Sequence, residues 1–223
     1  MKIQILTDKT SWFNKYSNIL KDKLHDLGHD VQLINSKNEL QNGDIAFFLS
    51  CFEIVGNEYL KLHEHNLVVH ESNLPEGKGW SPMTWQIIEG KNEIPIALFE
   101  AQAGVDSGDI WLKDTIKLNG YELIKDWQKL QAEKTIEMCL KFIKEYNNLK
   151  PKKQQGNETF YKRRTPKDSE LDINKSIKDQ FNLLRTVDNE KYPAFFKVGN
   201  SKYTIKIYNS LRERERERIK PKN

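Results

Sequence analysis

Two side chains that can carry acid–base chemistry, His70 and Asp106, lie 106 − 70 = 36 residues apart in this chain. An imidazole changes charge near neutral pH, so it can take up and release protons under physiological conditions. A carboxylate beside it can fix the orientation of the ring and stabilise the imidazolium form. Such a pair suits a reaction in which a proton moves while charge develops on a substrate. The alternative is a histidine in a turn and an unrelated acidic loop.

The segments around these residues predict where both side chains lie. Residues 66–69 are largely apolar and predict a buried strand that delivers His70 at its end. Residues 81–89 have a helical pattern, and residues 94–101 predict a second strand that leads into the loop of Asp106 and Asp109. Ligands of open α/β sheets bind at strand ends and in the adjoining loops, so we expect a site there.

The amino-acid sequence of this stretch resembles that of a known family. Residues 70–75 read HESNLP and are followed by Lys78-Gly79 and Pro82, while residues 106–110 read DSGDI. Both motifs, at this separation, resemble the active-site signature of the folate-dependent formyltransferases. The resemblance implies formyl transfer from N10-formyltetrahydrofolate to an amine, with His70 and Asp106 as the catalytic residues. One position departs from the family pattern, because Val68 occupies the place of the family's asparagine.

The N-terminal part predicts the sheet that carries the site. Apolar strands are expected at residues 2–6, 30–34 and 44–49, with a helix at residues 12–27 between the first two. Further on, a strand is expected at residues 110–116 and a long amphipathic helix at residues 121–146. This order predicts an α/β fold with a Rossmann-like parallel sheet in residues 1–150. The first strand-to-helix turn, residues 7–11, has no glycine, so a dinucleotide is not expected.

A smaller α+β module is expected at residues 151–209. It would contain a strand at residues 158–162, a helix at residues 174–187 and a hairpin made by residues 194–198 and 203–208. The pattern FYxRRTPxDSxLD resembles the second domain of nucleotide-sugar N-formyltransferases. Only 223 − 150 = 73 residues follow Lys150, too few for the longer barrel of methionyl-tRNA formyltransferases. Residues 210–223 form a charged tail. Within it residues 212–218 alternate Arg and Glu, which predicts a solvated helix extension or a disordered segment.

The resemblance implies that the acceptor is the amine of a nucleotide-linked amino sugar. The overall sequence most resembles the sequences of enzymes that act on UDP-linked 4-amino-4,6-dideoxy sugars of the pseudaminic acid route. One alternative is the same chemistry on another amine, such as an aminoacylated carrier or a purine intermediate. Another is a non-catalytic protein that binds folate or a nucleotide sugar.

The expected binding residues fall into two groups. The folate co-substrate is expected to meet residues after the third strand and in the second motif's loop: Ser50, Cys51, Phe52, Ile54, Gln102, Ala103, Gly104 and Asp106. The acceptor is expected to meet Ser72, Lys78, Gly79, Trp80, Met83, Arg163 and Arg164. Lys78 and the two arginines would bind a diphosphate, unless the arginines instead form salt bridges with Asp168 or Asp172. In place of the family's asparagine, Asn66, Ser72 or a water would donate to the oxyanion.

Composition narrows the remaining classes. The net charge of 36 − 32 = +4 is too small to indicate a nucleic-acid partner. The two cysteines, Cys51 and Cys139, lie far apart in apolar segments and favour a reduced, cytoplasmic protein. No apolar run is long enough for a membrane span, and residues 1–7 predict a strand rather than a signal peptide. His63 and His65 lack a completing ligand, so no metal is expected.

Overall fold

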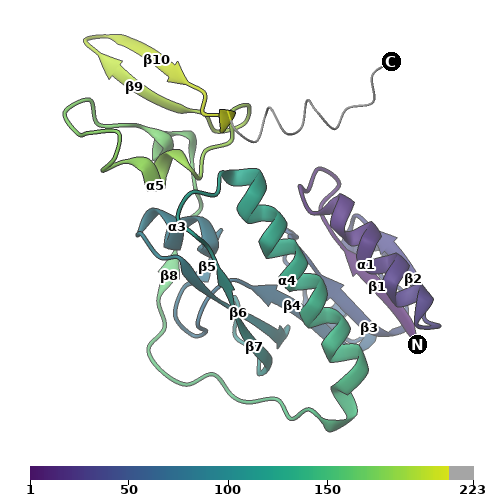
Figure 1. The fold of residues 1–223 in the computed structure, drawn as a ribbon. Helices are drawn as coiled ribbons and strands as arrows, with labels where there is room; N and C mark the ends of the chain where they lie inside the picture. The colour runs from purple at the N-terminus through teal and green to yellow at the C-terminus, as the bar shows by residue number, and fades with distance from the viewer. Residues whose placement is uncertain (211–223) are drawn as a thin grey trace, which may run out of the picture.

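The structure is a computed structural model, and it describes residues 1–210 of the chain. A six-stranded sheet forms the centre, with the strand order β2-β1-β3-β4-β6-β7 (Figure 1). Its strands are β1 Lys2–Leu6, β2 Asp30–Ile34, β3 Gly43–Phe48, β4 His63–His70, β6 Glu93–Glu100 and β7 Ile110–Lys117. The α/β fold predicted from sequence is therefore confirmed, with each strand within three residues of its expected start.

The sheet is mixed, which corrects the prediction of a parallel sheet. Strands β1 to β4 pair in parallel, whereas β6 is antiparallel to both β4 and β7. The register shows how β6 comes to run against β4, because Ala97 pairs with His70 and Glu100 pairs with Leu67. Strand β6 thus begins beyond the end of β4 and runs back beside it. The short helix α3, Pro82–Ile88, joins them at that end and does not cross back over the sheet.

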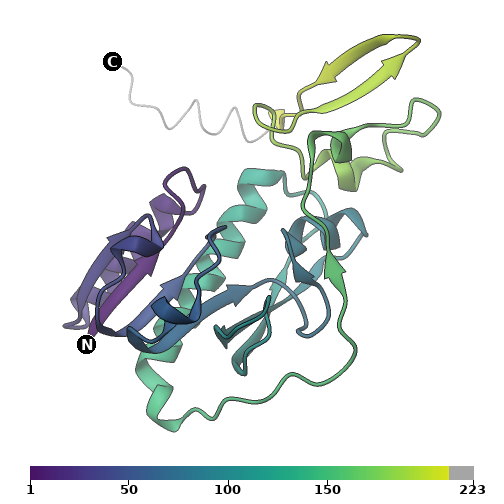
Figure 2. The same ribbon diagram turned by 180° about the vertical axis from the view of Figure 1, so that it is seen from behind.

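Two helices, α1 Asn14–Asp26 and α4 Ile124–Glu145, cover the same face of the sheet (Figures 1 and 2). Helix α4 has an apolar stripe that includes Trp127, Cys139 and Phe142, and all three side chains are buried. These residues pack with strand residues in the main core. A smaller apolar cluster lies on the opposite face. It is flanked by residues of α2 Asn57–Leu60, and the short helical turns are η1 Lys37–Glu39 and η2 Tyr146–Asn148.

The described chain after helix α4 pairs with the core through two short parallel strands. Strand β8, Phe160–Tyr161, pairs with β5, Lys78–Gly79. A hairpin follows, formed by β9 Ala194–Val198 and β10 Ser201–Ile205, so its second strand begins two residues before the expected position. The other elements here are η3 Pro166–Ser169 and α5 Phe181–Leu184. The division of the chain at residue 150 stays a prediction.

The predicted helix at residues 174–187 is wrong, because only the four residues of α5 are α-helical. Side chains in this segment bind the backbone in place of a helical ladder. The carboxylate of Asp172 accepts from the N–H of Asn174 at 2.9 Å, and the hydroxyl of Ser176 accepts from the N–H of Asp179 at 3.1 Å. Local bonds of this kind compete with helix formation, which periodicity alone does not register.

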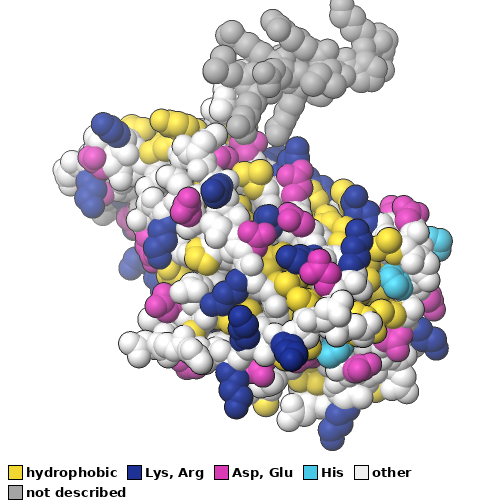
Figure 3. Space-filling view, turned by 60° about the horizontal axis from the view of Figure 1, so that its bottom comes forward, with side chains coloured by type: hydrophobic (Ala, Val, Ile, Leu, Met, Phe, Trp, Pro, Cys, Tyr) yellow, Lys and Arg dark blue, Asp and Glu magenta, His cyan; other side chains and the backbone are white. Residues whose placement is uncertain are grey.

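The surface seen in Figure 3 carries basic and acidic side chains interspersed, with hydrophobic side chains between them. Among the described residues, no helix is long and apolar enough to cross a membrane. The Arg/Glu segment at residues 212–218, for which a helix extension or disorder is predicted, lies outside the described residues.

Candidate active site

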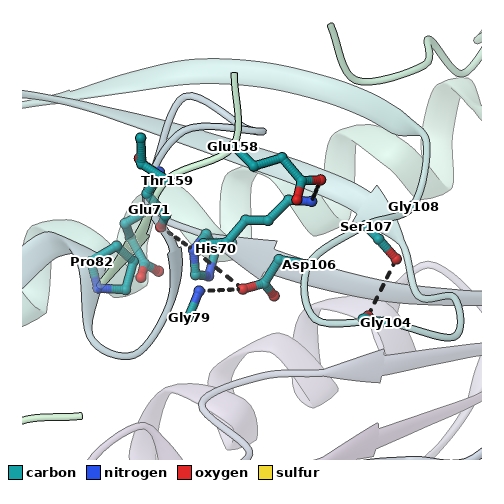
Figure 4. Close-up of polar contacts among 12 residues, drawn as sticks. His70, Glu71, Gly79, Pro82, Gly104, Asp106, Ser107, Gly108, Glu158 and Thr159 are labelled. Atoms are coloured by element: carbon teal, nitrogen blue, oxygen red, sulfur yellow. Dashed lines mark hydrogen bonds and ion pairs between the residues drawn. The ribbon is translucent and has the colours of Figure 1, made fainter. Parts of the chain in front are cut away.

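His70 is the last residue of β4, and its side chain is buried, with 6% of the residue exposed. The ring Nε2 lies 2.9 Å from the carbonyl oxygen of Gly77 and 3.6 Å from Oδ2 of Asp106 (Figure 4). The carbonyl oxygen of Gly77 can only accept, so Nε2 carries a hydrogen and donates it to that oxygen, while the carboxylate of Asp106 lies just beyond hydrogen-bond distance. The sequence prediction that these two side chains lie together agrees with this geometry.

Asp106 is held in place by the backbone of the neighbouring loop. Its Oδ2 accepts a hydrogen bond of 2.8 Å from the N–H of Gly79, and its carbonyl oxygen accepts one of 2.8 Å from the side chain of Gln154. The residue has a φ of +48°, in the left-handed region that non-glycine residues rarely adopt. The loop therefore holds Asp106 in an unfavourable backbone conformation that directs its carboxylate toward His70.

One cavity of about 480 Å³ opens beside the pair. In residues 1–210 three non-glycine residues have a positive φ, namely Ser50, Ser81 and Asp106, and all three lie on its wall. Strained backbone of this kind is concentrated at functional sites, because the surrounding structure must hold it in place. The volume falls within the range of roughly 300–1,000 Å³ typical of small-molecule sites. The cavity is therefore our candidate active site.

The residues expected to bind folate divide into two sets. Ser50, Cys51, Phe52 and Asp106 lie on the wall of the cavity, whereas Ile54, Gln102, Ala103 and Gly104 are exposed and do not line it. Ile54 is 78% exposed, so the segment after Phe52 turns outward. Burial raises the pKa of the Cys51 thiol to about 11, so the thiol stays protonated at neutral pH and is a poor nucleophile.

The residues expected to bind the acceptor divide in the same way. Gly79, Met83, Arg163 and Arg164 line the cavity, and Ser72, Lys78 and Trp80 do not. Lys78 is 3% exposed, and its ammonium group forms an ion pair with Glu158. The Lys78 ammonium group, which was expected to bind a diphosphate, is therefore already paired with a carboxylate of the protein.

The two arginines have different environments. Arg163 is exposed at the rim, with its guanidinium 4.8 Å from the ring centre of Trp80, which stacks on Phe52. Arg164 is partly buried and donates to the carbonyl oxygen of Thr186 at 3.2 Å and to Oγ of Ser169 at 3.0 Å. The expected alternative, a salt bridge from either arginine to Asp168 or Asp172, does not form. The carboxylate of Asp168 pairs with Lys162.

Neither protein side chain expected to replace the family's asparagine faces the cavity. The amide nitrogen of Asn66 donates to the carbonyl oxygen of Leu60 at 2.8 Å, and Ser72 is buried away from the cavity. Val68 itself lies on the cavity wall. The position where the asparagine would stand is thus apolar in this chain.

Sequence reasoning missed a polar part of the wall. Glu71 lines the cavity together with Gln128, Gln131 and Thr135 of α4. Burial raises the pKa of the Glu71 carboxyl, although the nearby His70 and a hydrogen bond with Gln131 oppose this shift. A signal was present, since these polar residues interrupt the stripe of α4 that faces the sheet. The part of the chain after Lys150 adds Thr186, Asp188, Lys191 and Tyr192 to the wall.

Comparisons with known proteins agree with this geometry. No protein-family model matches the chain. A methionyl-tRNA formyltransferase from Clostridium acetobutylicum is 26% identical over 82% of this chain. This chain spans 59% of that relative's length, and 52% of the length of a similar relative from Clostridium beijerinckii.

Solved structures show the same fold. A methionyl-tRNA formyltransferase from Clostridium thermocellum has a TM-score of 0.75 at 27% identity, covering 91% of this chain and 90% of that one. A likely sugar N-formyltransferase from Mycobacterium tuberculosis has a TM-score of 0.72 at 16% identity, covering 92% and 96%. HypX from Aquifex aeolicus, solved with tetrahydrofolic acid, has a TM-score of 0.75 at 19% identity, covering 89% and 36%. The chain thus has the fold of these formyltransferases, and its sequence is similar to that of the methionyl-tRNA formyltransferases.

Proposed function

We propose that this chain transfers a formyl group from N10-formyltetrahydrofolate to the amine of a nucleotide-linked amino sugar. The observation that carries the proposal is the His70–Asp106 pair, with 3.6 Å between Nε2 and Oδ2, on the wall of a small-molecule cavity. The similar HypX structure holds tetrahydrofolic acid, which supports folate as the formyl donor. Sugar N-formyltransferases among the similar structures support the acceptor class.

The chemistry follows from the position of the pair. The amine attacks the formyl carbon, and negative charge develops on the formyl oxygen. The Nε2–H of His70 donates to that oxygen in place of Gly77. Asp106 orients the His70 ring and accepts, directly or through water, the proton that the attacking amine loses. That proton then passes to N10 as the C–N10 bond breaks. Each of these roles contributes on the order of 10²–10⁴-fold in rate.

The cavity walls support a small acceptor. Residues of the C-terminal module, among them Arg164 and Lys191, close one side of the cavity. The exposed guanidinium of Arg163, beside Trp80, can bind a diphosphate at the rim through paired hydrogen bonds. The nucleotide would then lie outside and the amino sugar inside, next to His70.

A second candidate acceptor is methionyl-tRNA. The curated relatives that match this chain carry the name methionyl-tRNA formyltransferase. The chemistry at His70 would be the same, and only the acceptor would differ. Under this alternative the exposed Arg163 would contact a nucleic acid backbone in place of a sugar nucleotide.

An acceptor panel tests the proposal. The wild-type chain is incubated with N10-formyltetrahydrofolate and, separately, with UDP- and dTDP-linked 4-amino-4,6-dideoxyhexoses, methionyl-tRNA and glycinamide ribonucleotide. We expect a formylated nucleotide sugar by mass spectrometry. His70→Ala should abolish it while folate binding survives, and the exposed His25→Ala serves as the control. Formylation of methionyl-tRNA alone would replace the sugar by tRNA, and no turnover with any amine would refute the proposal.

A further inference from the structure

Glu71 occupies a distinctive position in the cavity. It follows His70 directly, in the bend after β4, where the N–H of Ser72 donates to the carbonyl oxygen of His70 at 3.0 Å. In Figure 4 the Glu71 carboxylate and Asp106 flank the His70 ring from opposite sides. The backbone of Glu71 is fixed because Gln86 donates to its carbonyl oxygen at 2.6 Å. Its side chain lies on the cavity wall, which Gln131 of α4 also lines.

The acceptor amine poses a chemical problem that the His70–Asp106 pair leaves open. A sugar amine exists largely as an ammonium ion at neutral pH, and an ammonium ion has no lone pair with which to attack. The ring Nε2 of His70 already carries a hydrogen and faces Gly77 and Asp106. A separate base on the cavity wall is therefore required before the carbon–nitrogen bond can form.

We propose that Glu71 is this base, a catalytic residue that pairs with the acceptor's ammonium group and takes one proton from it. The inference rests on the proposed function, and it deepens it by requiring an acceptor that arrives as a cation. The free amine then attacks the formyl carbon. The new C–N bond forms, the C–N10 bond breaks, and the second amine proton passes through the His70–Asp106 pair to N10. Glu71 finally releases its proton to water.

The charges around Glu71 fit this role. His70 and Asp106 are the ionisable groups beside it, and the module contributes Arg163, Arg164, Asp188 and Lys191 to the same cavity. Burial raises the pKa of the Glu71 carboxyl above its ordinary value of 4.5. A carboxylate with a raised pKa is a stronger base, because the ideal catalytic pKa approaches the operating pH. Gln131, on the same cavity wall, can donate to the carboxylate and keep it oriented.

The test compares Glu71→Gln and Glu71→Asp with the wild type, and uses Glu64→Gln on the exposed part of the same strand as the matched control. With a UDP-linked 4-amino-4,6-dideoxyhexose as acceptor, we expect Glu71→Gln to lower kcat about 10²–10⁴-fold. The loss should shrink as the pH rises and the amine deprotonates in solution. Glu71→Asp should retain part of the activity, and Glu64→Gln all of it.

Binding provides a second measurement that does not depend on turnover. By calorimetry without folate, Glu71→Gln should weaken binding of the amino sugar nucleotide and leave its 4-hydroxy analogue unchanged. Equal kcat, pH profile and amino-sugar affinity in Glu71→Gln and an active wild type would overturn this inference alone. A wild type inactive with every amine of the panel would remove the proposed function and this inference together. A Tm of each variant no lower than that of the wild type separates a lost base from a lost fold.

Discussion

Replacing Arg185 by methionine should weaken the packing of the segment after Lys150 against Asn92 and Glu122. Arg185 is fully buried, and its guanidinium lies 3.4 Å from Oε2 of Glu122 and 2.7 Å from Oδ1 of Asn92. Removing one partner of a buried ion pair costs about 3–5 kcal/mol, because the other charge stays buried. Glu122 keeps hydrogen bonds from the N–H groups of Asn119 and Gly120, so we expect the lower end, about 3 kcal/mol.

Thermal unfolding measures this cost. For a chain of this size each kcal/mol shifts Tm by about 2–4 °C, so Arg185→Met should lower Tm by about 6–12 °C. The double variant Arg185→Met/Glu122→Gln should recover part of the loss, because it no longer buries an unpaired carboxylate. Arg163→Met, at an exposed arginine of the same module, is the control and should cost less than about 1 kcal/mol. A Tm for Arg185→Met that matches the control would refute the reasoning.

Three further outcomes can be checked on single variants. Val68→Asn, on the cavity wall, should raise kcat by restoring an oxyanion donor, and a lower kcat at unchanged Tm would count against this account. Gly79→Ala should destabilise the chain by about 1–3 kcal/mol and lower kcat. Gly79 has a φ of +96°, and a Cβ there would lie 2.6 Å from the carbonyl oxygen of Tyr161. A Tm equal to that of the wild type would contradict this prediction. Glu71→Gln should raise Tm at pH 8. The pKa of Glu71 is raised in the folded state, so the folded state binds more protons than the unfolded state. The wild type therefore loses stability as the pH rises from 4.5 through the folded pKa, and the variant does not. The gain should vanish toward pH 4, and a pH-independent difference would exclude this cause.

Much of the sheet follows from local patterns in the sequence. Strands β1 to β4 each contain a short apolar stretch, and such stretches favour the buried positions of a parallel sheet. The direction of β6 could not be predicted in this way, because it depends on whether α3 crosses back over the sheet. The missing helix at residues 174–187 has a similar cause, since side chains such as Asp172 and Ser176 decide the local hydrogen bonds.

The site was predictable where motif and geometry coincide. His70 and Asp106 could be placed together because two motifs resembling one family have the right separation. Lys78 could not be placed, because its burial and its partner Glu158 depend on the distant β5–β8 pairing. Glu71 was overlooked for a related reason, since only the packing of α4 against the strand end encloses its carboxylate.

The central claim is that His70 and Asp106 act as one unit in formyl transfer. A single-turnover assay with formyltetrahydrofolate and the best acceptor of the panel measures it directly, comparing the wild type, His70→Ala, Asp106→Asn and the double variant. Residues that act as a unit are non-additive, so we expect each single change to slow transfer by about 10²–10⁴-fold and the double change to cost no more than the worse single change. Near wild-type rates in either single variant, or costs that multiply in the double variant, would contradict the account.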